Sequence, residues 1–168
     1  MNRLYRALLA LLLLALALSG KAADNVQFSG NLIATPLCTL SDKGGRIDVR
    51  FQRNIAINRI DGHEYRQPIP YQLDCPGAAG SGIAWRMRLT LVGDPTAFDP
   101  AALQTSIPDL GIKVLLDGAA LVVGISRPLQ VSNGSPLPLL EAVPVKRRDA
   151  VLQSKDFTAS ALLLAELY

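Results

Sequence analysis

Residue types that carry most enzyme chemistry are scarce in this chain. It has one histidine, His63, and two cysteines among 168 residues, and aromatic residues make up 5% of the sequence. One histidine can supply neither a histidine-based catalytic triad nor a metal site with several imidazole ligands. The cysteines do not form a C-x-x-C pair, and the sequence has no glycine-rich phosphate loop and no nucleophile elbow. We therefore expect a protein that is not an enzyme and that uses no metal or cofactor.

Long hydrophobic runs are absent except near the N-terminus. Arg3 and Arg6 precede an apolar run over residues 7–18, which is shorter than the ~20 residues that a membrane-spanning helix needs. Gly20 and Ala22 then supply small residues at the positions that a signal peptidase recognises. This arrangement is typical of a secretory signal peptide, so we expect residues 1–22 to be removed on export.

The mature chain has no excess of either charge. The sequence has 17 Lys and Arg residues and 14 Asp and Glu residues, and three of the basic ones, Arg3, Arg6 and Lys21, belong to the expected signal peptide. The remaining 14 basic residues balance the 14 acidic ones. Without a basic surface, the mature chain is not expected to bind nucleic acid.

Both cysteines, Cys38 and Cys75, lie in the exported part of the chain, where disulfides form and persist. Two thiols in an oxidising compartment usually pair, so we expect a disulfide between them. It would close a loop of about 38 residues and contribute about 4 kcal/mol in the chain-entropy model.

Alternation of apolar and polar residues predicts an antiparallel β-sandwich. Turn clusters separate the alternating runs, Asp117-Gly118 is a strong hairpin dipeptide, and no long helical periodicity is present. Two prolines, Pro138 and Pro144, are expected at the edges or ends of their strand. The predicted strands are residues 26–34, 47–51, 69–75, 85–91, 112–116, 120–125, 137–145 and 157–167.

The first and last alternating runs predict an open groove. The first begins just after the expected cleavage site, and the last ends at the last residue of the sequence. An immunoglobulin-like sandwich that lacks its last strand exposes an apolar groove that another segment must fill. The N-terminal segment of a neighbouring molecule has a suitable alternation to fill it. The predicted fold is therefore all-β, an incomplete immunoglobulin-like sandwich of six strands that is completed by a donor strand from another subunit.

Three motifs stand out in the mature chain. They are the run from Val26 to Ala34 followed by Pro36 and Cys38, Leu73-Asp74-Cys75-Pro76, and Asp156-Phe157-Thr158-Ala159-Ser160-Ala161. In these motifs the chain resembles the fimbrial subunits of chaperone–usher pili, type 1 and P pili among them. The resemblance covers essentially the whole mature chain.

The resemblance implies a donor-strand extension of residues 23–36 and a pilin domain of residues 37–168, with Cys38 and Cys75 joined. Its donor-strand residues would be Val26, Phe28, Gly30, Leu32 and Ala34. The C-terminal strand that forms the acceptor groove and contacts the chaperone would carry Phe157, Ala159, Ala161, Leu163, Ala165 and Leu167.

The implied partners are neighbouring pilus subunits, a periplasmic chaperone and an outer-membrane usher. The implied location is the cell-surface pilus, reached through the periplasm. Because the extension starts close to the cleavage site, a minor or adaptor subunit that supports cell adhesion is favoured over the main rod subunit. The alternative is a monomeric secreted β-sandwich that acts as a binding module or small adhesin, in which residues 23–36 pair within their own chain.

Two positions depart from the family's pattern. Lys155 stands where a glycine is usual, and Leu167 is penultimate where the family has a tyrosine. Both belong to the segment that the chaperone and the donor strand contact, so the register of a donor strand in the groove stays open.

Overall fold

The computed structural model describes residues 26–35, 38–42, 45–77, 86–129 and 137–168. The expected signal peptide, residues 1–22, lies outside them, as do residues 23–25 and 36 of the expected extension. The chain divides into two units, residues 1–33 and 34–168. In the first unit, residues 26–33 form no helix or strand. No helix in the described ranges is long and apolar enough to cross a membrane.

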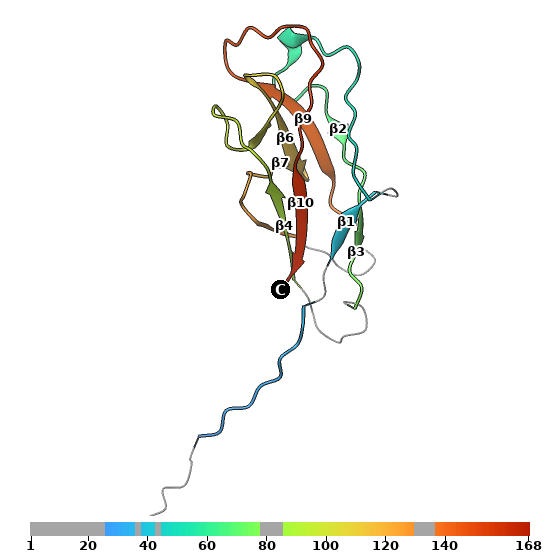
Figure 1. Cartoon of the computed structure of the whole chain (residues 1–168), viewed down its shortest axis with the longest axis vertical. Helices are drawn as coiled ribbons and strands as arrows, with labels where there is room; N and C mark the ends of the chain where they lie inside the picture. The colour runs from blue at the N-terminus through green and yellow to red at the C-terminus, as the bar shows by residue number, and fades with distance from the viewer. Residues whose placement is uncertain (1–25, 36–37, 43–44, 78–85, 130–136) are drawn as a thin grey trace, which may run out of the picture. The chain divides into compact units, whose positions relative to one another are not determined.

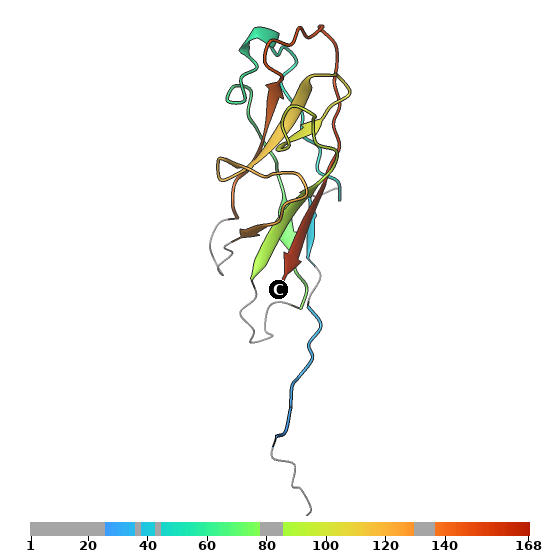
Figure 2. The same cartoon turned by 90° about the vertical axis from the view of Figure 1, so that its left-hand side faces the viewer.

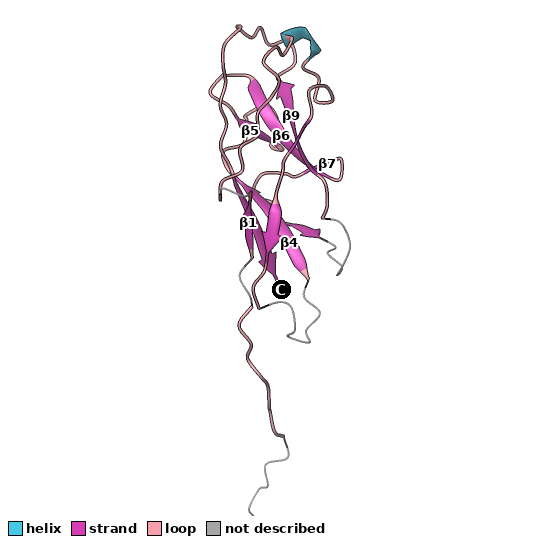
Figure 3. Ribbon diagram, turned by 90° about the vertical axis from the view of Figure 1, so that its right-hand side faces the viewer, coloured by secondary structure: helices cyan, strands magenta, loops and turns pink. Residues whose placement is uncertain are grey.

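The second unit is all-β, and the strand pairs within its described residues are all antiparallel (Figure 1). The first sheet pairs β1 (Thr39–Ser41) with β3 (Gln72–Asp74). The second has the order β10 (Leu162–Leu167), β4 (Met87–Val92), β8 (Arg127–Leu129). The third has the order β2 (Gln67–Pro68), β9 (Leu140–Lys146), β6 (Leu110–Leu116), β5 (Ala102–Gln104), and β7 (Ala119–Ala120) also pairs with β6. One short 3₁₀ helix, η1 (Ile57–Arg59), precedes β2 (Figure 3).

The core lies between the second and third sheets, as expected for a sandwich. Leu89 and Leu91 of β4 pack with Val114 of β6 and Leu140 of β9 in one buried cluster. β6 and β9 are paired over their whole length and are buried on both faces at most positions, which makes them the centre of the unit.

The predicted hairpin at Asp117-Gly118 is confirmed. β6 pairs with β7 directly across these two residues, with Leu116 opposite Ala119. Asp117 and Gly118 have φ angles of 48° and 79°, the positive values that a two-residue hairpin turn requires. The Asp117 N–H donates to the Leu139 oxygen, and the Leu139 N–H donates to Asp117 Oδ1, each at 2.8 Å. These two hydrogen bonds connect the turn to the segment that leads into β9.

Pro144 lies inside β9 rather than at its end, opposite Ile112 of β6. β2 covers the other edge of β9 only at Glu141 and Ala142. In the described residues that edge has no strand partner at Pro144, so its missing N–H costs no ladder bond there.

Several predicted strands are shorter than expected or absent. Residues 47–51 form no strand, and of residues 157–167 only the last six are paired. Residues 69–75 contribute only β3, after β2, and residues 120–125 contribute only the end of β7. Alternation gives a segment one apolar face, but a strand also needs a hydrogen-bonding neighbour. β4 ends at Val92 opposite Leu162, so the chain before Leu162 extends beyond its partner.

Gly111 in β6 provides a test of how closely the third sheet is packed. A Cβ there would lie 2.8 Å from Cγ2 of Thr96, 3.0 Å from Cβ of Ala102 and 3.1 Å from the backbone oxygen of Leu103. Thr96 and Ala102 are buried, so neither can move away easily. We expect Gly111→Ala to lower the free energy of unfolding in urea by about 2 kcal/mol, because overpacking of a buried site costs about that much. Gly30→Ala is the matched control, since a Cβ at Gly30 meets nothing within 4 Å. Equal stability of the two variants would contradict this account.

Candidate functional site

A groove of about 1400 Å³ opens on the second unit between two segments that form no strand. One wall is residues 45–56 with Ile57, which rise from β1 to η1 in Figure 1, and the other is residues 152–161, which lead into β10. Figure 2 shows the same two segments from a perpendicular direction. Phe51 and Phe157, one from each wall, meet with their ring centroids 5.7 Å apart.

The groove is open to the hydrophobic core. Side chains from six strands, β1, β4, β5, β6, β9 and β10, line it, and several of them, such as Leu91 and Val114, belong to the buried core cluster. The first wall alternates in exposure, with Ile47, Val49 and Phe51 half-buried and the residues between them exposed. This wall therefore has the side-chain pattern of a strand that faces the core from one side.

The backbone of both walls is mostly unpaired. Residues 46–55 make no backbone hydrogen bond to any other described residue. In the second wall, Thr158 alone forms backbone hydrogen bonds with another described residue, which is Ser106. The Ser106 N–H donates to the Thr158 oxygen at 2.8 Å, and the Thr158 N–H donates to Oγ of Ser106 at 3.0 Å. Two extended segments with free N–H and C=O groups on either side of an apolar floor can accept an added strand, because a strand would satisfy the backbone and cover the core together.

The proposed donor residues lie in the fully exposed segment 26–35. Val26 is 60% exposed, Phe28 92% and Leu32 100%, and Gly30 and Ala34 are exposed with them. Exposure of several large apolar side chains along one short segment is uncommon on the surface of a soluble monomer.

The six residues proposed on the C-terminal strand divide into two groups. Phe157, Ala159, Ala161 and Leu163 line the groove. Ala165 and Leu167 do not line the groove and pack on the hydrophobic core of the same unit, Ala165 buried and Leu167 half-buried, and Leu163 packs on that core as well. The opposite wall from Ile47 to Ile57 was not assigned to the site from the sequence, although its alternation from Ile47 to Phe51 was visible there.

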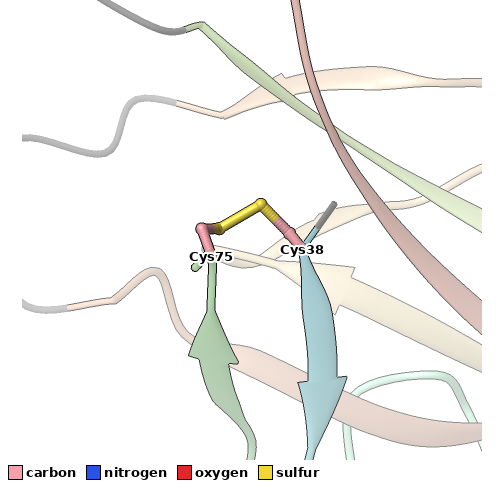
Figure 4. Close-up of a disulfide and its surroundings, with 2 residues drawn as sticks. All are labelled: Cys38 and Cys75. Carbon is pink, nitrogen blue, oxygen red and sulfur yellow. A yellow bond between two sulfur atoms is a disulfide. The ribbon is translucent and has the colours of Figure 1, made fainter. Parts of the chain in front are cut away.

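Cys38 and Cys75 form a disulfide, as predicted (Figure 4). Thr39 of β1 pairs with Asp74 of β3, so the adjoining cysteines face each other across the two strands with a Cα separation of 4.2 Å. Both cysteines pack against the hydrophobic core cluster. The bond holds the start of the first sheet at the point where the N-terminal segment joins the second unit.

Titratable groups with shifted pKa values lie outside the groove, and their shifts have structural causes. Two hydrogen bonds from Arg147 lower the pKa of Asp109, and the backbone N–H groups of Glu64 and His63 lower that of Asp61. Partial burial is the largest single influence on Asp99 and raises its pKa, but the hydrogen bond from Lys113, the hydrogen bond from the Ala101 N–H and the charge of Lys113 together outweigh it, so the pKa is lowered. These ionised carboxylates stabilise loops through their hydrogen bonds. None of them is paired with a second group in the arrangement of a general acid and a general base.

No cluster of three or more potential metal ligands occurs in the part of the chain that the structure describes. His63 is exposed in a turn, where its N–H donates to Asp61 Oδ1 at 2.8 Å.

The fold is that of pilus subunits with an immunoglobulin-like sandwich. The chain aligns with the P pilus adaptor subunit PapF at a TM-score of 0.55 and 18% identity, covering 79% of this chain and 96% of that one. It aligns with the P pilus rod subunit PapA at a TM-score of 0.55 and 18% identity, covering 86% and 100%. These likenesses define the fold class, which agrees with the all-β immunoglobulin-like prediction.

Relatives in sequence define the family. The chain is 35% identical over 158 residues to the fimbrial-like protein YfcQ of Escherichia coli (strain K12), covering 94% of this chain and 96% of that protein. It is 30% identical over 138 residues to the fimbrial-like protein YfcR of the same strain, covering 79% and 74%. No protein-family model matches the sequence. The chain belongs to the family of fimbrial-like proteins, which agrees with the predicted resemblance and with the expectation of a structural protein rather than an enzyme.

Proposed function

We propose that this chain is a structural subunit of a chaperone–usher pilus and that it polymerises by donor-strand exchange. The groove between residues 45–57 and 152–161 is the acceptor for the N-terminal extension of a neighbouring subunit, and residues 23–36 of this chain are the donor strand that it lends to another subunit. The observation that carries the proposal is the groove between two walls whose backbone is mostly unpaired, because an added strand would satisfy that backbone and pack on the core side chains that line the groove.

The exposed segment supports the donor half of the proposal. Its apolar residues alternate, so one face of the extended segment can enter successive positions of the groove while its backbone pairs with both walls. Phe28 and Leu32 are the largest groups on that face, and Gly30 between them allows close approach of another backbone.

The proposal extends to the assembly route. A periplasmic chaperone lends a strand to the groove after export, and an outer-membrane usher exchanges it for the extension of the next subunit. The subunit then resides in the cell-surface pilus, in a minor or adaptor position that supports adhesion. Each of these steps needs the same feature, which is a groove that is not filled by the chain's own residues.

The test is a thermal melt of the mature chain without residues 23–36, with Cys38 and Cys75 oxidised. We expect a low midpoint that rises when a peptide of residues 23–36 is added, since a ligand of the folded state alone stabilises it by about 2.7 kcal/mol at a hundredfold excess over Kd. A peptide of the same composition without the alternation is the control and should give no rise. A protein that is already stable and indifferent to the peptide would instead be a complete sandwich, and the secreted binding module would replace the pilus subunit.

A further inference from the structure

Charged side chains are unevenly distributed around the groove. Four cations and two anions line it, namely Arg46, Arg50, Arg53, Lys155, Asp48 and Asp156. Arg46 and Asp48 pair with each other at 3.3 Å. Neither Arg53 nor Lys155 forms an ion pair or a side-chain hydrogen bond with any described residue. The first wall, with Arg46, Arg50, Arg53 and Asp48, therefore has an excess of positive charge, whereas on the second wall Lys155 is followed directly by Asp156.

These two cations occupy equivalent places on the two walls. Arg53 follows Phe51 by two residues, and Lys155 precedes Phe157 by two. The two rings are in contact, and both wall segments continue from that contact towards η1 and the loop after β9, at the upper end in Figure 1. Arg53 and Lys155 thus lie on the same side of the ring contact, at one end of the groove. Arg50, Arg53 and Lys155 are all exposed, but Arg50 is one residue from Phe51 rather than two, so it belongs to the opposite alternate positions of its wall.

We infer that this end of the groove selects a donor strand that carries a carboxylate, and that the strand comes from a different subunit rather than from a second copy of this chain. The inference rests on the proposed function. Desolvated unpaired cations weaken binding of an apolar strand, whereas a carboxylate on the strand would neutralise them.

The direction of the strand decides which of its ends meets the cations. The described strand pairs are all antiparallel, and a donor strand antiparallel to β10 places its C-terminal end beside Lys155. In this chain that end is Ala34, Thr35 and Pro36, which carry no charge, and the acid of the segment, Asp24, is at the other end. The chain's own extension therefore lacks the group that the groove favours, which suits a subunit that joins unlike neighbours.

The experiment compares peptides of residues 23–36 in binding to the mature chain with its disulfide intact, followed by fluorescence anisotropy. One pair of peptides places a glutamate on the groove-facing alternation, as Ala34→Glu or Pro36→Glu, and a control peptide places it on the other face, as Thr35→Glu. The mature chain keeps its own residues 23–36, which compete with every peptide for the groove to the same extent, so the ratios of the measured affinities are unaffected. We expect one of the first two to bind about fivefold more tightly than the unaltered peptide at low ionic strength, the size of a favourable ion pair. The gain should vanish near 1 M salt, where the Debye length is about 3 Å.

Variants of the groove identify the cations. Arg53→Gln with Lys155→Gln should abolish the gain, while Arg50→Gln, the matched control at the opposite alternate position of the wall, should retain it. Equal binding of all alternating peptides would overturn the selectivity and leave the proposed function standing. A second result would also overturn the selectivity, namely weaker binding of an Asp24→Asn peptide together with no gain from either glutamate. Asp24 would then be the residue that meets the cations, so the strand would run in the opposite direction. Binding of no alternating peptide at all would overturn the proposed function together with this inference.

Discussion

A peptide of residues 23–36 in which Phe28 and Leu32 are both replaced by Asp is expected to bind the groove about a thousandfold more weakly than the unaltered peptide. Burial of a Phe or Leu side chain contributes about 1.5–3 kcal/mol each, and a carboxylate that enters an apolar site adds a desolvation penalty. Both side chains are almost fully exposed in the structure, so this burial is entirely available to binding. Isothermal calorimetry with the mature chain lacking its own extension measures the two affinities.

The matched control carries the same added charge on the opposite face of the strand. A peptide with Gln27→Asp and Asn31→Asp keeps all the groove-facing residues, and its affinity should stay within about fivefold of the original, the range of exposed charge effects. Equal losses in the two double variants would mean that net charge, and not the alternation of apolar side chains, controls binding. That result would contradict a donor strand that binds through alternate side chains.

Loss of the disulfide is expected to lower the free energy of unfolding by about 4 kcal/mol, the value for a loop of this length. Cys38→Ser with Cys75→Ser in the same chain tests this by urea unfolding. The first sheet has two strands of three residues each, and an isolated pair of that size is marginal without a further constraint. Its amide protons in β1 and β3 should therefore exchange fastest in the variant.

Reduction of the unaltered protein supplies the control for this experiment. It removes the same constraint without changing any residue, so it should give the same loss as the double serine variant. A loss below about 1 kcal/mol in both cases would mean that packing of Cys38 and Cys75 on the core holds the first sheet without the bond. A loss only in the serine variant would point to the substituted side chains themselves.

Local patterns in the sequence determined much of this protein. The alternating runs over residues 47–51 and 69–75 fixed which of their residues face inward, because side chains of an extended chain point to opposite faces in turn. Asp117-Gly118 fixed the β6–β7 hairpin through the positive φ angles that its two residues adopt. The two cysteines fixed their own pairing, since the described chain has no free cysteine with which either could exchange.

The tertiary structure alone decided which alternating segments become strands. Residues 47–51 alternate more regularly than residues 112–116 do, yet only the latter are paired, by β9 on one side and by β5 and β7 on the other. Likewise Phe157 and Leu167 belong to one alternating run, but one lines the groove and the other packs on the core, because β4 stops at Val92. Arg53 and Lys155 are distant in sequence, and their common position at one end of the groove follows from the Phe51–Phe157 contact. Alternation depends on a residue's immediate neighbours, whereas strand pairing and charge balance depend on segments that only the folded chain brings together.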